Sequence, residues 1–305
     1  MSRLLRAGVV GAGVFGAYHA TQYAALADVE LTGVYDLDRG RAAALAARFG
    51  TQAADGLEQL IDAADVITVA SPAVAHAGAA LAALGAGRSV YVEKPIATSL
   101  EDADRIVAAA AARGLVAACG FLERAGFAAM GLFDVPERPV LLEAVRLGEP
   151  SPRSLDVSVV LDLMIHDLDL ARTLTPAEPL AVEAEGARRR NDSLDDVEAE
   201  ATFADGFVAR FHASRVAPAR QRTMRLVYPS GEVRVDFLTH AFENTTPFKL
   251  DRDFAQTPAG RDKLGASLAQ FLAAVRGEAA RPLADATDGA RALDLALAVE
   301  LAAGA

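Results

Sequence analysis

The chain has 305 residues, of which 52% are hydrophobic and 23% charged, a composition that predicts two folded domains and excludes a disordered protein. Its formal net charge of −11 disfavours nucleic acid and anionic membranes as main partners, because their phosphates would be repelled, and leaves a small-molecule substrate. A single cysteine, Cys119, excludes an internal disulfide, and the lack of a signal-peptide pattern or a bilayer-length apolar run predicts a cytoplasmic protein.

The first predicted elements are a strand, a glycine-rich loop and a helix. An apolar strand (residues 4–10) leads into a glycine loop, Gly11 to Gly16 with the sequence Gly-Ala-Gly-Val-Phe-Gly, and then a helix (17–26). In this context the glycines let the backbone approach a pyrophosphate at a helix N-terminus. A second strand (29–35) ends at Asp36, 20 residues after Gly16, where a carboxylate would bind the adenosine ribose. We therefore predict NAD rather than NADP, although Arg39 and Arg41 lie nearby.

Strands and helices continue to alternate as far as about residue 120, which predicts a parallel, doubly wound sheet. Strands are expected at 66–70, 89–92 and 116–120, and helices at 42–49, 57–61, 74–84 and 100–113. Ligands of such sheets bind at the C-terminal ends of the strands. For His76, a structural role and a role near the cofactor are equally open. The predicted cofactor-binding residues are Gly11, Gly13, Val14, Phe15, Gly16, Asp36, Ser71, Pro72, His76, Glu93 and Lys94.

After residue 120 the pattern changes to that of a largely antiparallel sheet. A helix opens this part, and strands are expected at 140–147, 180–187, 197–203, 207–214, 222–228 and 233–237, with hairpin turns at Asp205-Gly206 and Ser230-Gly231. Helices at 262–276 and 287–303 close the chain. We predict an α/β protein with a Rossmann domain at residues 1–120 and an α+β domain with an open sheet at residues 121–305. The open sheet favours a homodimer or homotetramer.

An apolar helix predicted from Val159 to Leu174 carries one polar stripe. At about 100° per residue, Asp162, His166 and Asp169 fall within roughly 60° of one another. Because a buried carboxylate is costly unless it is paired or faces a wet cleft, the stripe is a candidate site. From the residues alone, a polar face that meets solvent is the alternative. Asp167 lies off the stripe and is interpreted as a surface or capping charge.

These motifs together resemble the Gfo/Idh/MocA family of oxidoreductases over essentially the whole chain. The resemblance is carried by the glycine loop, Asp36, Ser71-Pro72, His76, Glu93-Lys94-Pro95, Asp162 and His166. It implies that Lys94, Asp162 and His166 form the catalytic group at the nicotinamide. The segments 120–124 and 153–169 are similar to the branch that contains UDP-N-acetylglucosamine 3-dehydrogenases, which implies a sugar-nucleotide hydroxyl as the substrate group.

The residue types suit the oxidation of a secondary alcohol, which needs a base for the hydroxyl proton and a cation beside the developing alkoxide. His166 and Lys94 can each fill either role, and the sequence leaves open which of them accepts the proton. Asp162, one turn before His166, would hydrogen-bond the imidazole or a sugar hydroxyl. The predicted substrate residues are Arg124, Arg153 and Asp169, with the Arg188–Arg190 turn as a further source of positive charge for a diphosphate.

Other interpretations of the same residues stay open. A dehydrogenase of a free sugar or inositol would keep the family and change the substrate. A metal-dependent hydrolase would use Asp162, His166, Asp167 and Asp169 as ligands but would leave the glycine loop without a role, so no metal is predicted. A non-catalytic cofactor-binding regulator would not need the proton-transfer groups. Three further histidines have no partner in the sequence and are interpreted as structural: His19, His212 and His240.

Overall fold

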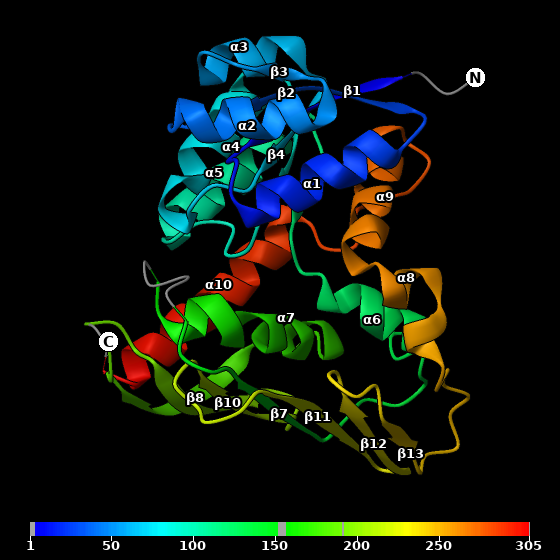
Figure 1. The fold of residues 1–305 in the computed structure, drawn as a ribbon. Helices are drawn as coiled ribbons and strands as arrows, with labels where there is room; N and C mark the ends of the chain where they lie inside the picture. Colours follow the sequence, from blue (N-terminus) through cyan, green and yellow to red (C-terminus); the bar gives the residue numbers. More distant parts are fainter. Residues whose placement is uncertain (1–3, 152–156, 191, 305) are drawn as a thin grey trace. The chain divides into compact units, whose positions relative to one another are not determined.

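The structure, a computed structural model, describes residues 4–151, 157–190 and 192–304 (Figure 1). The chain forms two compact units, Met1–Leu122 with Leu264–Ala290, and Glu123–Lys263 with Arg291–Ala305. The predicted boundary between residues 120 and 121 lies near the first crossing. Residues 264–290, expected in the second domain, instead belong to the first unit. The reason is that helix α9 (Lys263–Val275) packs apolar side chains into the core around the first strand.

The first unit contains a six-stranded parallel sheet in the order β3-β2-β1-β4-β5-β6. The strands are β1 (Leu5–Val10), β2 (Val29–Tyr35), β3 (Gln52–Ala53), β4 (Val66–Val69), β5 (Ser89–Val92) and β6 (Ala117–Cys119). They are connected by α1 (Val14–Ala25), α2 (Arg39–Phe49), α3 (Leu57–Ala63), the 3₁₀ turn η1 (Ala73–Ala75) with α4 (His76–Gly85), and α5 (Leu100–Ala111). This order, with its switch between β1 and β4, is that of a Rossmann fold and confirms the prediction.

The second unit contains a seven-stranded mixed sheet in the order β13-β12-β11-β7-β10-β9-β8. The strands are β7 (Leu141–Leu147), β8 (Pro179–Ala187), β9 (Asp196–Phe203), β10 (Val208–Ser214), β11 (Gln221–Tyr228), β12 (Gly231–Asp236) and β13 (Phe242–Asn244). Neighbours are antiparallel except for β7 and β10, so the sheet is largely antiparallel, as predicted. The predicted hairpins join β9 to β10 and β11 to β12.

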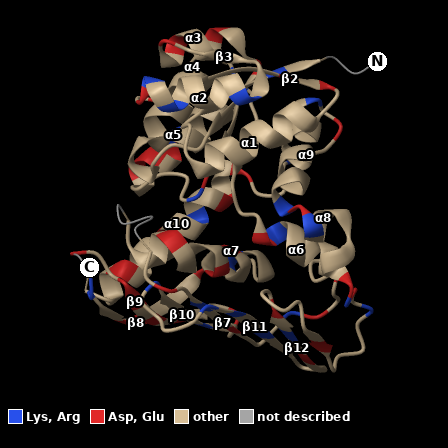
Figure 2. Cartoon of the chain, viewed as in Figure 1, with Lys and Arg blue, Asp and Glu red and all other residues tan. Residues whose placement is uncertain are grey.

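One face of the second sheet is buried and the other is charged. Strand β7 shows the alternation clearly, with Leu142, Ala144 and Arg146 buried and the residues between them partly exposed. The helices of this unit are α6 (Glu123–Met130), α7 (Ile165–Leu174), α8 (Pro258–Arg261) after the 3₁₀ turn η3 (Phe254–Gln256), and most of α10 (Ala286–Ala302). Figure 2 shows charges of both signs along the strands of this sheet. Within the described residues, no helix is long and apolar enough to cross a bilayer.

The helix predicted at 159–174 is divided into two parts. A π-helical turn, η2 (Val160–Met164), comes first, and the N–H of Ile165 donates to the carbonyl of Val160, five residues back. The Oγ of Ser158 accepts from the N–H groups of Val160 and Leu161 at 3.1 and 3.2 Å and thereby caps the turn. Because the turn is wider than an α-helical one, the angle calculated at 100° per residue does not apply to Asp162.

Candidate functional site

The glycine loop joins β1 to α1 and leaves space at the N-terminus of α1. Gly11 has a φ of +96°, and a Cβ on Gly16 would lie 1.8 Å from the carbonyl oxygen of Gly11, so both positions require glycine. At Gly13, in contrast, no atom considered within the described residues lies within 4 Å of where a Cβ would be. Helix α1 begins there without a side-chain cap, so its first N–H groups are available to an anion. This cradle fits a pyrophosphate.

Asp36 lies directly after β2 and is held beside the glycine loop. One carboxylate oxygen accepts from the N–H of Ala12 at 2.7 Å, and the other accepts from the N–H of Asp38 at 2.8 Å. The side chain of Asp38 in turn caps α2. The acidic group that the sequence predicts at the ribose is therefore fixed next to the pyrophosphate cradle.

His76, the first residue of α4, links the residues that follow two strands. Its Nδ1 lies 2.7 Å from the carbonyl oxygen of Pro95, and its Nε2 lies 2.8 Å from that of Ser71. Burial lowers the pKa of His76, so near neutral pH the neutral ring donates to one carbonyl at a time. The Oγ of Ser71 is buried and has no hydrogen-bond partner among the described residues. A bound group would satisfy this atom, which again fits a cofactor at this end of the sheet.

Glu93 and Lys94 follow β5 and differ in their surroundings. Glu93 is buried, and its Oε1 accepts from Nε2 of His19 on α1 at 2.7 Å, whereas Lys94 is half-buried. His19 is 0% exposed, so the histidine that has no neighbour in the sequence has a partner 74 residues away. The sequence contained one signal for this pair. Glu93 comes directly after four buried strand residues, and a buried carboxylate needs a hydrogen-bond donor.

In the second unit, His166 lies in the first turn of α7 and Asp162 in η2, and both are half-buried. Asp169, one turn further on, is paired with Arg124 of α6. The Nε and Nη2 of Arg124 donate to the two Asp169 oxygens at 2.8 and 2.6 Å, and the side chains are only 6% and 1% exposed. The two predicted substrate residues therefore lie together, and each neutralises the other's charge.

Asp167 is buried, so the sequence interpretation of it as a surface or capping charge is wrong. Arg146 of β7 donates to both of its oxygens at 2.9 and 2.8 Å. Arg146 also donates to Oε1 of Glu123 at 3.2 Å, and Nζ of Lys263 donates to Oε2 of Glu123 at 2.6 Å. The signal missed was Arg146 at an inward position of the β7 alternation, because the helical wheel considers one helix alone.

This network shifts the pKa values of Glu123 and Arg146. Burial alone would raise the pKa of Glu123, but Arg146, Lys263 and His166 outweigh burial and hold that pKa far below its usual range. Burial would lower the pKa of Arg146, and the carboxylates of Asp167 and Glu123 raise it above its usual value instead. Glu123 and Arg146 thus stay charged, and the charge on Glu123 lies within electrostatic reach of His166.

The remaining predicted residues do not join these clusters. Arg153 lies outside the described residues. The Arg188–Arg190 turn is exposed, and the side chains of Arg188 and Arg190 donate to backbone carbonyls. Across the described ranges, no three His, Cys, Asp or Glu residues are arranged to hold a metal ion. Asp167 and Asp169, two ligands of the metal alternative, are bound to arginines instead.

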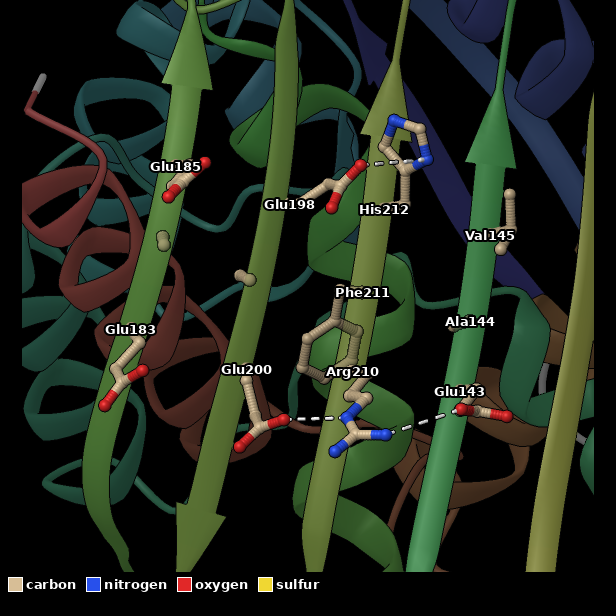
Figure 3. A pocket seen from close by; sticks show the side chains of 12 residues that line it. Glu143, Ala144, Val145, Glu183, Glu185, Glu198, Glu200, Arg210, Phe211 and His212 are labelled. Atoms are coloured by element: carbon tan, nitrogen blue, oxygen red, sulfur yellow. Dashed lines mark hydrogen bonds and ion pairs between the residues drawn. The ribbon is translucent and has the colours of Figure 1, made fainter.

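A hollow on the open face of the second sheet is lined by charged side chains of the neighbouring strands β7, β10, β9 and β8 (Figure 3). Arg210 lies between Glu200 at 2.7 Å and Glu143 at 3.8 Å, and His212 lies 4.0 Å from Glu198. The hollow contains none of the predicted catalytic or cofactor residues, so it is not the candidate active site.

A Rossmann sheet with a pyrophosphate cradle, joined to an α+β unit that carries a half-buried histidine, defines the class of dinucleotide-dependent oxidoreductases. Residues 5–121 match the oxidoreductase family Gfo/Idh/MocA, NAD-binding Rossmann fold, and residues 148–234 match a C-terminal domain of that family. The chain belongs to the Gfo/Idh/MocA family. It is an NAD-dependent dehydrogenase of a family that acts on sugar hydroxyls.

Similar proteins span most of the chain. A UDP-N-acetylglucosamine 3-dehydrogenase of Acidithiobacillus ferrooxidans is 37% identical, over 98% of this chain and 97% of that protein. Its solved structure, GnnA, has a TM-score of 0.91 over 99% of this chain and 98% of that one, at 36% identity. Inositol 2-dehydrogenase 3 of Saccharopolyspora erythraea is 31% identical over 64% of this chain and 60% of that protein. The WlbA dehydrogenase of Bordetella pertussis, solved with NADH and UDP-GlcNAcA, shares the fold, with a TM-score of 0.87 over 99% and 96% of the chains at 21% identity.

Proposed function

We propose that this protein is a cytoplasmic, NAD-dependent dehydrogenase that oxidises the 3-hydroxyl of UDP-N-acetylglucosamine. The observation that carries the proposal is the similarity to a UDP-N-acetylglucosamine 3-dehydrogenase along nearly the full length of both proteins, at 37% identity. The inositol dehydrogenase is similar over a smaller part of the chain, 64%. A match over a smaller part of the chain carries less information on the substrate.

The first unit offers complementary groups for NAD. The N-terminus of α1 receives the pyrophosphate above Gly13, Asp36 accepts from the ribose hydroxyls, and Ser71 Oγ is a further polar contact. Bound NAD supplies the acceptor for the hydride that leaves the sugar carbon. The carboxylate of Asp36 disfavours the additional phosphate of NADP.

Three side chains, those of Lys94, Asp162 and His166, handle the hydroxyl proton and the charge that develops on oxygen. Of Lys94 and His166, one accepts the proton and the other stabilises the alkoxide. Asp162 accepts from the imidazole of His166 or from a neighbouring sugar hydroxyl. Glu123, held by Arg146 and Lys263, lies within electrostatic reach of His166.

The diphosphate of the substrate requires positive charge. Arg124 is neutralised by Asp169, so the pair offers little net charge to a phosphate. We therefore assign the diphosphate to Arg153 and the exposed Arg188–Arg190 turn. Arg124 and Asp169 form a neutral pair that can orient hydroxyl groups of the substrate but not bind its diphosphate.

The test is a coupled reaction. A 3-keto sugar nucleotide accumulates poorly, so the enzyme is incubated with NAD, UDP-N-acetylglucosamine, glutamate and an aminotransferase that accepts such ketones. Mass spectrometry should then detect the amino-sugar nucleotide, and the Lys94→Ala enzyme should form it about a hundredfold more slowly. Product from a free sugar or from inositol, with none from any UDP-sugar, would overturn the substrate proposal and leave the family assignment intact.

The proposed enzyme is a homodimer or homotetramer. The open sheet face carries charged side chains of both signs, and we assign the contact between subunits to it (Figures 2 and 3). Light scattering coupled to size-exclusion chromatography measures the mass directly. A monomer at all concentrations would contradict this part of the proposal.

A further inference from the structure

Lys94 is flanked by two buried histidines that come from different helices. His19 of α1 holds the residue before Lys94, and His76 of α4 holds the residue after it. We infer that His19 and His76 are positioning residues that fix the backbone from which the Lys94 side chain extends. The inference rests on the proposed role of Lys94 in proton handling or charge stabilisation, and it gives the two histidines that hold the residues on either side of Lys94 a part in the reaction.

On the first side, the contact is a buried side-chain pair. Nε2 of His19 lies 2.7 Å from Oε1 of Glu93, with the side chains 0% and 7% exposed. The other oxygen of Glu93 lies over Gly120, where a Cβ would come within 2.7 Å of it. The ring of His19 also packs edge-on against Tyr91, with centroids 5.2 Å apart. Glu93 is therefore confined on two sides, its partner His19 is itself packed against Tyr91, and a shift of the Glu93 backbone would break the pair with His19.

On the second side, the contact is made to the backbone. Nδ1 of His76 lies 2.7 Å from the carbonyl oxygen of Pro95, and Nε2 lies 2.8 Å from the carbonyl oxygen of Ser71. The ring thereby spans the ends of β4 and β5. Between the two histidines, the backbone at Lys94 has neighbours fixed on both sides, whereas the lysine side chain itself is half-buried.

Holding a catalytic group in place has a large effect on rate, because a displacement of about 1 Å can cost about a hundredfold. A purely structural role predicts something else, since buried hydrogen bonds from α1 to the sheet would then stabilise the fold without affecting Lys94. The chain offers a matched control for that role. Tyr23, one turn after His19 on the same face of α1, is buried, and its hydroxyl lies 2.7 Å from Oγ1 of Thr68 in β4. Tyr23→Phe removes such a bond away from Lys94.

The experiment compares His19→Leu, His76→Leu and Tyr23→Phe in the full-length enzyme. We expect each histidine variant to lower kcat by about ten- to a hundredfold with little change in the Kd for NADH, and Tyr23→Phe to leave kcat within about twofold. His19→Gln, which can still donate to Glu93, should recover most of the lost kcat and serves where the leucine variant is too unstable. Equal effects of Tyr23→Phe and His19→Leu on kcat would overturn the inference.

A double-mutant cycle shows whether the histidines act through Lys94. If they do, His19→Leu should lower kcat no further in the Lys94→Ala enzyme, because the group it positions is gone. If the effects of His19→Leu and Lys94→Ala on kcat instead multiply in the double variant, the inference is overturned. Wild-type turnover by Lys94→Ala would instead refute the proposed role of Lys94.

A substrate-independent readout separates the two proposals. Reductive methylation of Lys94, followed by mass spectrometry, needs no turnover and can be measured whatever the substrate is. When the residues beside Lys94 are no longer held, the labelling rate of this half-buried lysine should rise by about twofold or more. We expect this rise in the histidine variants and not in Tyr23→Phe. An unchanged labelling rate in both histidine variants would overturn the inference even if the proposed substrate is wrong.

Discussion

At the scale of single residues, Lys94 and His166 belong to different units of the structure, which makes their roles separable. Lys94→Ala and His166→Ala should each lower turnover by about a hundredfold or more, the range for lost proton transfer. His166→Ala should still bind NADH normally, because the glycine loop and Asp36 lie in the other unit. Steady-state kinetics and fluorescence titration measure the two effects. Near-normal turnover of His166→Ala would show that this histidine is structural.

Asp36 should give a preference for NAD over NADP of about tenfold or more, roughly 1.4 kcal/mol. The nearby arginines offset this little, because Arg39 and Arg41 have acidic partners of their own, Asp55 at 3.7 Å and Asp38 at 3.2 Å. Titration with NADH and NADPH measures the preference.

Asp36→Asn is the informative variant, since an amide oxygen can still accept from the N–H of Ala12 while the charge is lost. Asp36→Asn should reduce the difference in affinity between NADH and NADPH, because it weakens NADH binding and improves NADPH binding. If the wild-type protein binds NADPH more tightly than NADH, Asp36 does not select the cofactor.

At the scale of elements, helix α7 is anchored by the network of Glu123, Arg146, Asp167 and Lys263. Burial would raise the pKa of Glu123, but its basic neighbours hold it below the value of about 4.3 expected in the unfolded chain. The unfolded state therefore binds more protons, and the stabilisation is complete above about pH 5 and is lost as the pH falls below it. The free energy of unfolding should decrease with acidification in this range.

Glu123→Gln should reduce the free energy of unfolding at pH 7 and flatten its dependence on pH between about 5 and 3. Urea unfolding at several pH values measures both effects. The matched control is Glu200→Gln, which removes an exposed ion pair with Arg210 and should change the stability by less than about 1 kcal/mol. A pH dependence as steep as that of the wild type would mean that Glu123 is not ionised with a lowered pKa in the native state.

Elements defined by local patterns were predictable from the sequence. The strand at 89–92 has the same bounds as β5, and the turns at Gly206 and Gly231 form the expected hairpins, because each signal lies within a few neighbouring residues. The π-helical turn η2 was not predictable, since a shift in the hydrogen-bond partner inside an apolar helix leaves the hydrophobic pattern unchanged. Strand β3 has two residues, too few to show an alternation.

In the candidate site, too, residues set by local spacing were predictable and contacts between distant elements were not. The glycine loop and Asp36 are set by spacing along one βαβ unit, so the sequence located them. The pairs His19–Glu93 and Arg146–Asp167 join residues 74 and 21 positions apart, on elements whose packing no local pattern specifies. The sequence interpretation changes most for Arg124 and Asp169. Each charge taken alone suggests a contact with the substrate, but in the structure the two form one neutral, buried pair.

At the scale of the whole molecule, the chain crosses between its two units at residues 122/123, 263/264 and 290/291, so neither unit is one continuous segment. The first unit needs the segment 264–290, because Leu268, Phe271 and Leu272 of α9 lie in the core beside residues of β1, α1 and β5. Burial of three such side chains contributes about 1.5–3 kcal/mol each, a sum comparable with the whole stability of a small domain.

Residues 1–122 expressed alone should therefore lack a cooperative unfolding transition. Joining residues 264–290 to them through a short glycine–serine linker should restore that transition and the binding of NADH, because the missing side of the core is replaced. Circular dichroism during urea unfolding and NADH fluorescence report the two properties. The same joined fragment with Phe271→Asp is the control and should behave like residues 1–122 alone, because a charge at a fully buried core position prevents packing. Cooperative unfolding of residues 1–122 by themselves would show that α9 is dispensable for the fold of the cofactor-binding unit.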